Sequence, residues 1–295
     1  MGDGRIADLA GRGVVAVSGA DAASFLDNLF TTDASAAGDG KAVFGALLAP
    51  QGKILFDFIV FRDGERFLID VARPLVADFV RRLGFYKLRA RVEIADLSDD
   101  HDVVATWGTD AAPVLDGPVA PDPRLSALGW RGIVPAGADM APDHVEASEA
   151  DYEAHRIALG VPAGGADFAY GDAFPHDVAM DHLNGVDFRK GCFIGQEVVS
   201  RMQHRGTARR RPVIVRGAGL AAGMPITSGE TPVGTVGSVT SGSGTGNLGV
   251  AIVRLDRAQE ARDAGVPAMA AGAPVELSLP AWAGFDWPKT DVSAG

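Results

Sequence analysis

Three short apolar runs between residues 42 and 70 constrain the fold most, because the turns between them leave little choice of pairing. Residues 42–48 and 54–61 are separated by Pro50-Gln51-Gly52-Lys53, and Asp63-Gly64 separates the second run from residues 66–70. Short turns rich in glycine and proline join strands that pair antiparallel. The sequence therefore predicts a three-stranded meander.

Helical patterns and two further short strands surround this meander. Asp21 is a candidate N-cap for a helix over residues 22–30, and residues 74–83 place apolar side chains three and four positions apart. Helices are also expected over 149–159 and 196–204, and strands over 14–17 and 103–107. Residues 86–94 alternate in polarity, which predicts a strand whose polar face carries Lys87, Arg89 and Arg91.

The last third of the chain has a different pattern. From residue 212 onward, short Val- and Ile-rich runs alternate with Gly- and Ser-rich turns, at residues 213–215, 233–240, 248–253 and 275–279. Such spacing predicts a small all-β barrel domain. The glycine-rich residues 242–246 are expected to form a flexible hairpin tip, because no Lys-Ser/Thr pair and no helix follow as a phosphate loop requires.

Charge and cysteine content limit the functions that are open to the chain. The formal net charge is −11, which disfavours nucleic acids and anionic membranes as partners. A single cysteine among 295 residues excludes an intramolecular disulfide and fits a reducing, cytoplasmic compartment. No apolar run approaches the 18 or so residues that span a bilayer. The run Arg209-Arg210-Arg211 is then a solvated surface or a seat for a phosphate or carboxylate.

The single cysteine, Cys192, follows Lys190-Gly191 and precedes a predicted helix. A helix N-terminus and a nearby lysine both favour the thiolate, which is the reactive form of the side chain. The alternative is a small buried apolar residue, which is the common fate of a free cysteine. Local chemistry leaves both interpretations open.

Residues 190–197, Lys-Gly-Cys-Phe-Ile-Gly-Gln-Glu, together with Arg201, resemble the signature of the YgfZ-type folate-binding proteins. These are relatives of the glycine-cleavage T-protein, an aminomethyltransferase, and of a mitochondrial iron–sulfur maturation factor. The resemblance extends over nearly the whole chain, through residues 31–33, 50–57, 82–89, 152–162 and 233–239. Motifs that match in this order make the similarity specific.

The resemblance implies an α+β fold of the T-protein type, with three domains in a cloverleaf. Residues 1–206 would form the folate-binding region, as two interleaved α+β subdomains of which the second covers roughly 45–140. Residues 207–285 would form the C-terminal β-barrel, followed by a tail over 286–295. Tetrahydrofolate is the expected cofactor, and iron–sulfur client or scaffold proteins are the expected partners.

The resemblance also nominates site residues. Cys192, Lys190 and Asp57 are the candidate catalytic residues, and Cys192 is a candidate transient contact to an iron–sulfur cluster rather than part of a resident metal site. The candidate folate-binding residues are Tyr86, Lys87, Arg89, Arg156, Gln196, Glu197 and Arg201. A basic pocket would hold the anionic glutamate tail of folate.

Two departures weaken a transferase function. The T-protein carries two adjacent acids in its hairpin, whereas this chain has Phe56-Asp57, and position 158, where the T-protein has a pterin-binding Glu, is Ala. A carboxylate for the pterin would have to come from elsewhere, for example from Asp177 or Asp181. The main hypothesis is therefore a tetrahydrofolate-binding accessory protein of iron–sulfur cluster assembly or repair.

Two alternatives remain. The first is a folate-dependent aminomethyltransferase or methyltransferase that uses Asp57 near the reacting nitrogen. The second is a binding module with a basic pocket, in which Cys192 is purely structural.

Overall fold

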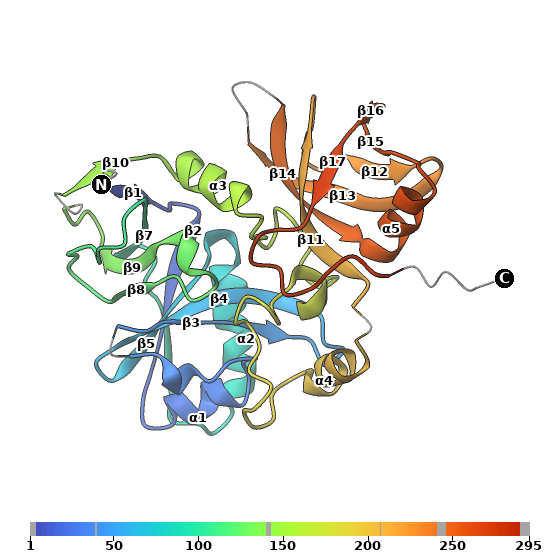
Figure 1. The fold of residues 1–295 in the computed structure, drawn as a ribbon. Helices are drawn as coiled ribbons and strands as arrows, with labels where there is room; N and C mark the ends of the chain where they lie inside the picture. Colours follow the sequence, from blue (N-terminus) through green and yellow to red (C-terminus); the bar gives the residue numbers. More distant parts are fainter. Residues whose placement is uncertain (1–3, 39, 140–142, 207, 241–245, 290–295) are drawn as a thin grey trace. The chain divides into compact units, whose positions relative to one another are not determined.

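The computed structural model describes residues 4–38, 40–139, 143–206, 208–240 and 246–289 (Figure 1). These residues divide into two compact units. The first contains Met1–Tyr152 and Leu183–Ser200, and the second contains Glu153–His182 and Arg201–Gly295. The division falls within two helices, α3 (Glu149–Ala158) and α4 (Gln196–Arg205). The domain boundaries expected from the resemblance stay predictions.

The meander forms the centre of one sheet in the first unit, and its prediction is confirmed. Strands β3 (Val43–Leu48), β4 (Ile54–Asp63) and β5 (Arg66–Ala72) pair antiparallel in sequence order. Strand β2 (Arg12–Ser18) pairs with β5, and β6 (Glu93–Asp96) completes the sheet. The order of the sheet is β3-β4-β5-β2-β6.

Helices α1 (Ala22–Asp27) and α2 (Val76–Lys87) supply side chains to the core of this unit. Alternate residues of β4, Phe56 and Phe58, enter the core together with Phe30 and Phe79. The Phe30 and Phe58 ring centroids lie 4.2 Å apart and those of Phe58 and Phe79 lie 5.5 Å apart. Aromatic rings at these distances add attraction beyond the area that they bury.

The predicted strand over 86–94 is wrong for most of its length. Helix α2 continues through Tyr86 and Lys87, and the chain turns at Leu88, whose φ is +41°. Strand β6 begins only at Glu93. The alternating pattern misled the prediction because Tyr86 and Lys87 extend the apolar and polar faces of the preceding helix equally well. The predicted helix over 74–83 also begins with a 3-10 turn, Arg73–Leu75.

A second sheet of the first unit has the order β10-β1-β7-β9-β8. Its strands are β1 (Gly4–Asp8), β7 (His101–Trp107), β8 (Val119–Pro121), β9 (Trp130–Pro135) and β10 (His144–Glu146). The β1–β10 pair is parallel and the others are antiparallel. The Pro- and Gly-rich stretch after β7 is therefore more regular than its composition indicates.

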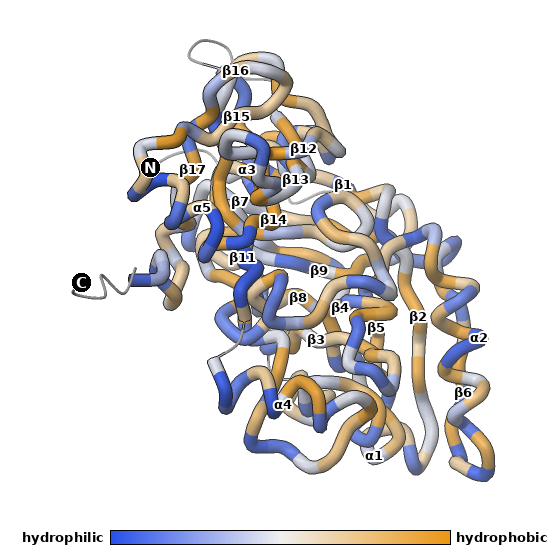
Figure 2. Tube along the Cα trace, turned by 90° about the vertical axis from the view of Figure 1, so that its right-hand side faces the viewer, coloured by the Kyte–Doolittle hydropathy of each residue, from blue (hydrophilic) through white to orange (hydrophobic). Residues whose placement is uncertain are grey.

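The second unit contains a seven-stranded antiparallel sheet that forms a near-closed barrel. Its strands are β11 (Arg210–Gly217), β12 (Pro225–Ser228), β13 (Thr231–Thr240), β14 (Asn247–Arg254), β15 (Ala268–Ala270), β16 (Ala273–Pro274) and β17 (Glu276–Ser278). Helix α5 (Leu255–Asp263), which the sequence analysis missed, is predominantly hydrophilic, in contrast to β2 (Figure 2). The predicted α+β fold with a C-terminal barrel is confirmed.

Two terminal predictions fall largely outside the described residues. The glycine-rich tip is described only at Gly246, and residues 290–295 of the expected tail are not described. Before that point, Trp287 packs against the barrel core, and the Cζ atom of Arg262 lies 4.2 Å from the centroid of its ring. No helix in the described part of the chain is long and apolar enough to cross a membrane.

The aromatic core yields a stability prediction. Phe30→Ala removes a fully buried ring that contacts two other rings, so we expect the free energy of unfolding to fall by about 3–5 kcal/mol. Val114→Ala, at a position with 84% exposure, is the control and should change it by less than about 0.5 kcal/mol. Urea denaturation measures both values, and equal effects would contradict the packing described.

Candidate functional site

Cys192 lies on an irregular loop that leads into helix α4, and its side chain is exposed. It is therefore not the buried apolar residue of the structural interpretation. Helix α4 begins at Gln196, four positions later, so Cys192 precedes the first turn of the helix. The neighbouring Phe193 is buried, so the two adjacent side chains face opposite ways, the ring toward the core and the thiol outward.

Lys190 ties the start of this loop to the end of helix α1. Its ammonium donates hydrogen bonds to the backbone carbonyls of Asp27, Phe30 and Thr32, and it lies 2.9 Å from the Asp27 carboxylate. Only 3% of the side chain is exposed. The last carbonyls of a helix have no partner within the helix and carry partial negative charge, so a cation is stabilising there. A catalytic role for Lys190 stays a prediction, while its anchoring contacts are direct.

Two glycines hold the end of the loop against the β3–β4 turn. Gly195 has φ +81°, and a Cβ built on it would lie 2.7 Å from the Ala49 carbonyl oxygen. Gly52, in the turn itself, has φ +80°, and its Cβ would lie 2.9 Å from Val198. Both positions need glycine, because a side chain would be strained and would push the two segments apart. The loop is thus fixed at Lys190 and at Gly195, with Cys192 between them.

Asp57, the third candidate catalytic residue, lies in the middle of β4 opposite Ala46 of β3. Its neighbours Phe56 and Phe58 face the aromatic core, so Asp57 faces the other side of the sheet. It is 8% exposed. Its proposed role in transfer chemistry stays a prediction.

Tyr86, Lys87 and Arg89 come together at the C-terminal end of α2, although not on a strand. They line a cavity of about 400 Å³, together with Phe25 of α1 and Asn28, which directly follows that helix. Asp21, at the rim, does not cap α1 as predicted. Its carboxylate accepts hydrogen bonds from the Arg91 side chain and backbone instead, which lowers the pKa of Asp21.

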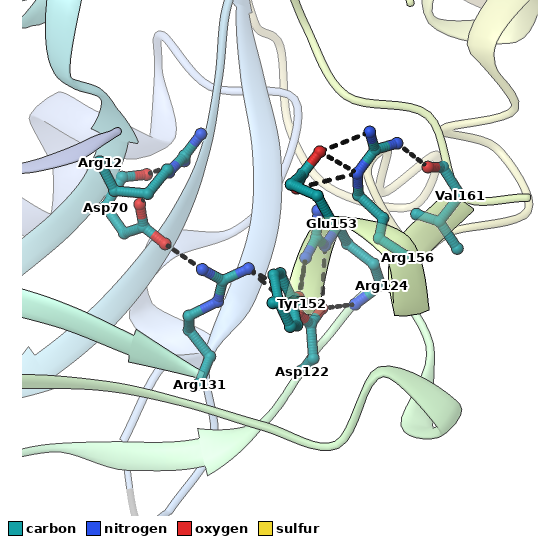
Figure 3. Close-up of polar contacts among 9 residues, drawn as sticks. All are labelled: Arg12, Asp70, Asp122, Arg124, Arg131, Tyr152, Glu153, Arg156 and Val161. Carbon is teal, nitrogen blue, oxygen red and sulfur yellow. Dashed lines mark hydrogen bonds and ion pairs between the residues drawn. The ribbon is translucent and has the colours of Figure 1, made fainter. Parts of the chain in front are cut away.

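Arg156 is buried in the second unit and all five of its N–H groups are engaged. They donate to Glu153, to the Val161 carbonyl, to Asp167 and to the Ser238 hydroxyl. Figure 3 shows the contacts of Arg156 with Glu153 and Val161. A folate would have to displace one of these partners to contact the guanidinium. Arg156 thereby links α3, the loop after it and strand β13 within the unit.

The other predicted folate-binding residues, Gln196, Glu197 and Arg201, lie on helix α4. Gln196 is partly exposed, and Glu197 and Arg201 are exposed. Gln196 and Glu197 belong to the first unit and Arg201 to the second. Their role in folate binding stays a prediction.

A buried polar network in the first unit was missed by the sequence analysis. The Tyr152 hydroxyl accepts hydrogen bonds from Arg124 and Arg131, at 3.1 and 2.9 Å (Figure 3). Asp122 pairs with both arginines; its burial opposes ionisation, but the two cations outweigh this and lower its pKa. Asp70, fully buried, pairs with Arg131 from the other side. Apart from Asp122 and Arg124, which are two residues apart, these partners are distant in sequence, so no local pattern indicated the network.

The two acids suggested as alternative pterin partners are also engaged, both within the second unit. Asp181 accepts two hydrogen bonds from Arg211, at 2.7 and 2.9 Å, and Asp177 accepts one from the Phe174 backbone N–H. Asp181, Arg211 and His182 line a cavity of about 500 Å³. Burial lowers the pKa of His182. No group of three or more metal-ligating side chains occurs among the residues that the structure describes.

Comparisons with known proteins agree with this architecture. Residues 3–144 match the family model of the GCVT N-terminal domain, and residues 208–285 match that of the CAF17 C-terminal β-barrel domain. The crystal structure of the glycine cleavage system aminomethyltransferase T from Bartonella henselae superposes with a TM-score of 0.71. It covers 94% of this chain and 85% of that chain, at 19% identity, and therefore supports the fold alone.

Several relatives share the name iron–sulfur cluster assembly factor IBA57, mitochondrial, or its homologue. The protein from Pyricularia oryzae is 32% identical over 293 residues, covering 89% of this chain and 75% of the relative. The protein from Mycosarcoma maydis is 34% identical, covering 71% and 56%, and the mouse protein is 29% identical, covering 84% and 77%. The chain spans only about half the length of the relatives from Mycosarcoma maydis and Neurospora crassa. Their names place them in mitochondria, so the cytoplasmic location stays a prediction.

The anchoring role of Lys190 is directly testable. Lys190→Met keeps the length of the side chain but removes the donor to the carbonyls of Asp27, Phe30 and Thr32, so we expect the free energy of unfolding to fall by about 2–3 kcal/mol. The loop should also loosen, which would change the rate at which a thiol reagent labels Cys192. Lys41→Met, at an exposed lysine, is the matched control. Unchanged stability and labelling in Lys190→Met would show that the contacts are incidental.

Proposed function

Because the chain belongs to the family of the IBA57 iron–sulfur cluster assembly factors, we propose that it acts in iron–sulfur cluster assembly, with Cys192 as its contact to the cluster. The observation that carries the proposal is the position of this thiol. Cys192 is exposed on a loop that is fixed at both ends, by Lys190 and by Gly195. Such a loop presents one thiol to another protein without a change of fold.

The chemistry requires a second protein. Thiolates are the usual ligands of iron–sulfur clusters, and a cluster normally takes four of them. This chain has one cysteine. The cluster is therefore a substrate that Cys192 contacts while a partner holds the remaining ligand positions. A single protein thiolate suits a transient contact, because it can be replaced by a ligand of the recipient.

The surroundings of Cys192 support this role. Gly191 precedes it, and a Cβ built on Gly191 would meet no atom within 4 Å. The approach to the thiol on this side is therefore open. The buried Phe193 on the other side holds the backbone in place.

Replacing the thiol tests the proposal. We expect Cys192→Ser, expressed in cells that lack the gene, not to restore the activity of [4Fe–4S] enzymes of the aconitase and radical-SAM types under oxidative stress. Cys192→His, which restores an iron ligand of another kind, should recover part of the activity. Both variants must accumulate at normal levels and unfold like the parent protein. Full activity with Cys192→Ser would refute the role.

Tetrahydrofolate binding is the second part of the proposal, and it rests on the resemblance of the motifs. Lys87 and Arg89 would hold the anionic tail through charge-assisted hydrogen bonds. Arg156 has no N–H group left for the ligand, and position 158 is Ala, so the pterin needs partners other than those of the T-protein. The structural similarity to an aminomethyltransferase concerns the fold, and an accessory function therefore has the better support.

A titration of the purified protein with tetrahydrofolate tests binding separately from thiol chemistry. We expect the parent protein and Cys192→Ser to bind with the same affinity, because the thiol takes no part in folate recognition. The Lys87→Gln/Arg89→Gln variant should bind about tenfold more weakly or worse, through loss of charge-assisted hydrogen bonds. Calorimetry or tryptophan fluorescence gives the affinities. Absence of binding by the parent protein would remove folate from the proposal and leave the role of Cys192 untouched.

A further inference from the structure

The C-terminal end of α2 exposes two large apolar side chains. Phe85 is 68% exposed and Leu88 is 88% exposed. Phe79 and Leu83 of the same helix are fully buried, so Phe85 lies on the face turned away from the core. A single exposed apolar residue is ordinary, but two large ones at one helix end form a patch that commonly marks an interaction site.

Leu88 is also held in a strained backbone conformation. Its φ is +41° and its ψ is −104°, a region that residues with a side chain rarely adopt. Glycine would meet this turn without strain. The chain thus has, at a position suited to glycine, a large apolar side chain that points into solvent. Strain of this kind concentrates at functional positions, and stability of the fold gives no reason for it.

Unpaired cations surround the two apolar side chains. Arg82 lies three residues before Phe85 on α2, and Lys87 and Arg89 flank Leu88. Among the described residues, none of these three has a carboxylate within ion-pairing distance, whereas the nearby Arg81 and Arg91 pair with Asp78 and Asp21. The patch therefore has an excess of positive charge within a chain whose net charge is −11.

The patch borders a cavity and shares a helix with the Cys192 loop. The cavity of about 400 Å³ is lined by Phe25 and Leu29, from α1 and the residues after it, and by Tyr86 and Ala90. The same segment, at Asp27 and Phe30, receives the Lys190 ammonium. Because Phe25 of the cavity and Asp27, which accepts from Lys190, both lie on the six-residue helix α1, we expect one protein interface of ordinary size to reach both the cavity and the loop.

We propose that the C-terminal end of α2, with Phe85, Leu88, Arg82, Lys87 and Arg89, is the docking surface for an acidic face of the protein that shares the cluster with Cys192. The partner places carboxylates against the three cations and an apolar side chain in the cavity beside Tyr86. Phe85 and Leu88 are the apolar anchors. The inference rests on the proposed function, and it deepens it by stating how the partner is recognised.

A protein fits these observations better than a membrane does. The overall charge of −11 opposes approach to an anionic lipid surface. A concave apolar site next to the two anchors is suited to a protruding side chain, which a bilayer does not present. Lys87 and Arg89, the cations proposed above for the folate tail, then also contact the partner's carboxylates, and the experiment measures the two ligands separately.

The test is site-specific photo-cross-linking in cells with the full chain. A photoreactive aromatic residue replaces Leu88 in one variant and Val114, which is 84% exposed, in the control. We expect an adduct with an acidic iron–sulfur assembly or client protein from position 88 only. The affinity of that protein, once purified, should fall about tenfold or more with Phe85→Ser/Leu88→Gly, and it should fall as salt concentration rises. The matched control is Val114→Ser/Val145→Ser, at two exposed apolar positions of the same unit.

The variants separate docking from folding and from thiol chemistry. Leu88→Gly relieves the backbone strain, so the double variant should unfold at the same urea concentration as the parent or a higher one. In Cys192→Ser, the client enzymes should lose activity while the cross-linked adduct at position 88 still forms. If the adduct were lost as well, partner binding would depend on the thiol, and the docking proposal would be overturned. Failure of Cys192→Ser to affect clients, with the adduct intact, would refute the cluster contact alone.

Four further results overturn the docking surface. They are the absence of an adduct at position 88, identical adducts at positions 88 and 114, binding to phosphatidylglycerol vesicles that depends on Phe85 and Leu88, and an effect of Lys87→Gln/Arg89→Gln on tetrahydrofolate affinity with no effect on the affinity for the partner.

Discussion

The contact between the Lys190 ammonium and the end of α1 is the interaction on which the geometry of the Cys192 loop depends. A buried ammonium costs several kcal/mol unless hydrogen bonds and charge compensate it. Here three carbonyls and the Asp27 carboxylate do so. The end of α1 and the loop therefore stabilise each other. If either moved, the Lys190 ammonium and the carbonyls that it contacts would lose their partners. From the sequence, Lys190 was a candidate to favour the Cys192 thiolate. In the structure, its visible contacts anchor the loop that carries Cys192.

Much of the fold followed from local sequence patterns. The meander was predictable because its turns, at residues 50–53 and 63–64, are too short for any other connection, and helix α4 was predictable from its spacing. The structure of residues 86–94 was not predictable in this way. Tyr86 and Lys87 fit both the alternating polarity of a strand and the continuing faces of helix α2. What decides between them is the position of Leu88, which ends the helix in a conformation that propensity does not favour.

The candidate site was predictable as a motif but not as an arrangement. The resemblance nominated Cys192 and Lys190, yet the carbonyls that bind Lys190 lie about 160 residues earlier in the chain. Similarly, nothing near Arg131 in the sequence indicates its contacts to Tyr152 and Asp70. Buried polar groups find partners across the fold, because burial requires a partner and does not specify where in the chain it comes from.

The distribution of the arginines and lysines connects the site to its partner. Arg131, Arg156 and Lys190 are buried and have their charge compensated within their own unit, so they stabilise the fold and attract nothing from outside. Of the three unpaired cations around Phe85 and Leu88, Arg82 and Arg89 are exposed and Lys87 is half-buried. At short range their field exceeds the diffuse repulsion of a distant net negative charge, which salt screens within about 10 Å. An acidic protein is therefore repelled by most of this surface and attracted by the patch around Phe85 and Leu88. The same charge of −11 that disfavours polyanions in general thus makes the basic patch around Phe85 and Leu88 selective for orientation. Selective orientation is what a protein with a single cluster ligand needs, because one thiol can complete a cluster only when the partner's ligands face it.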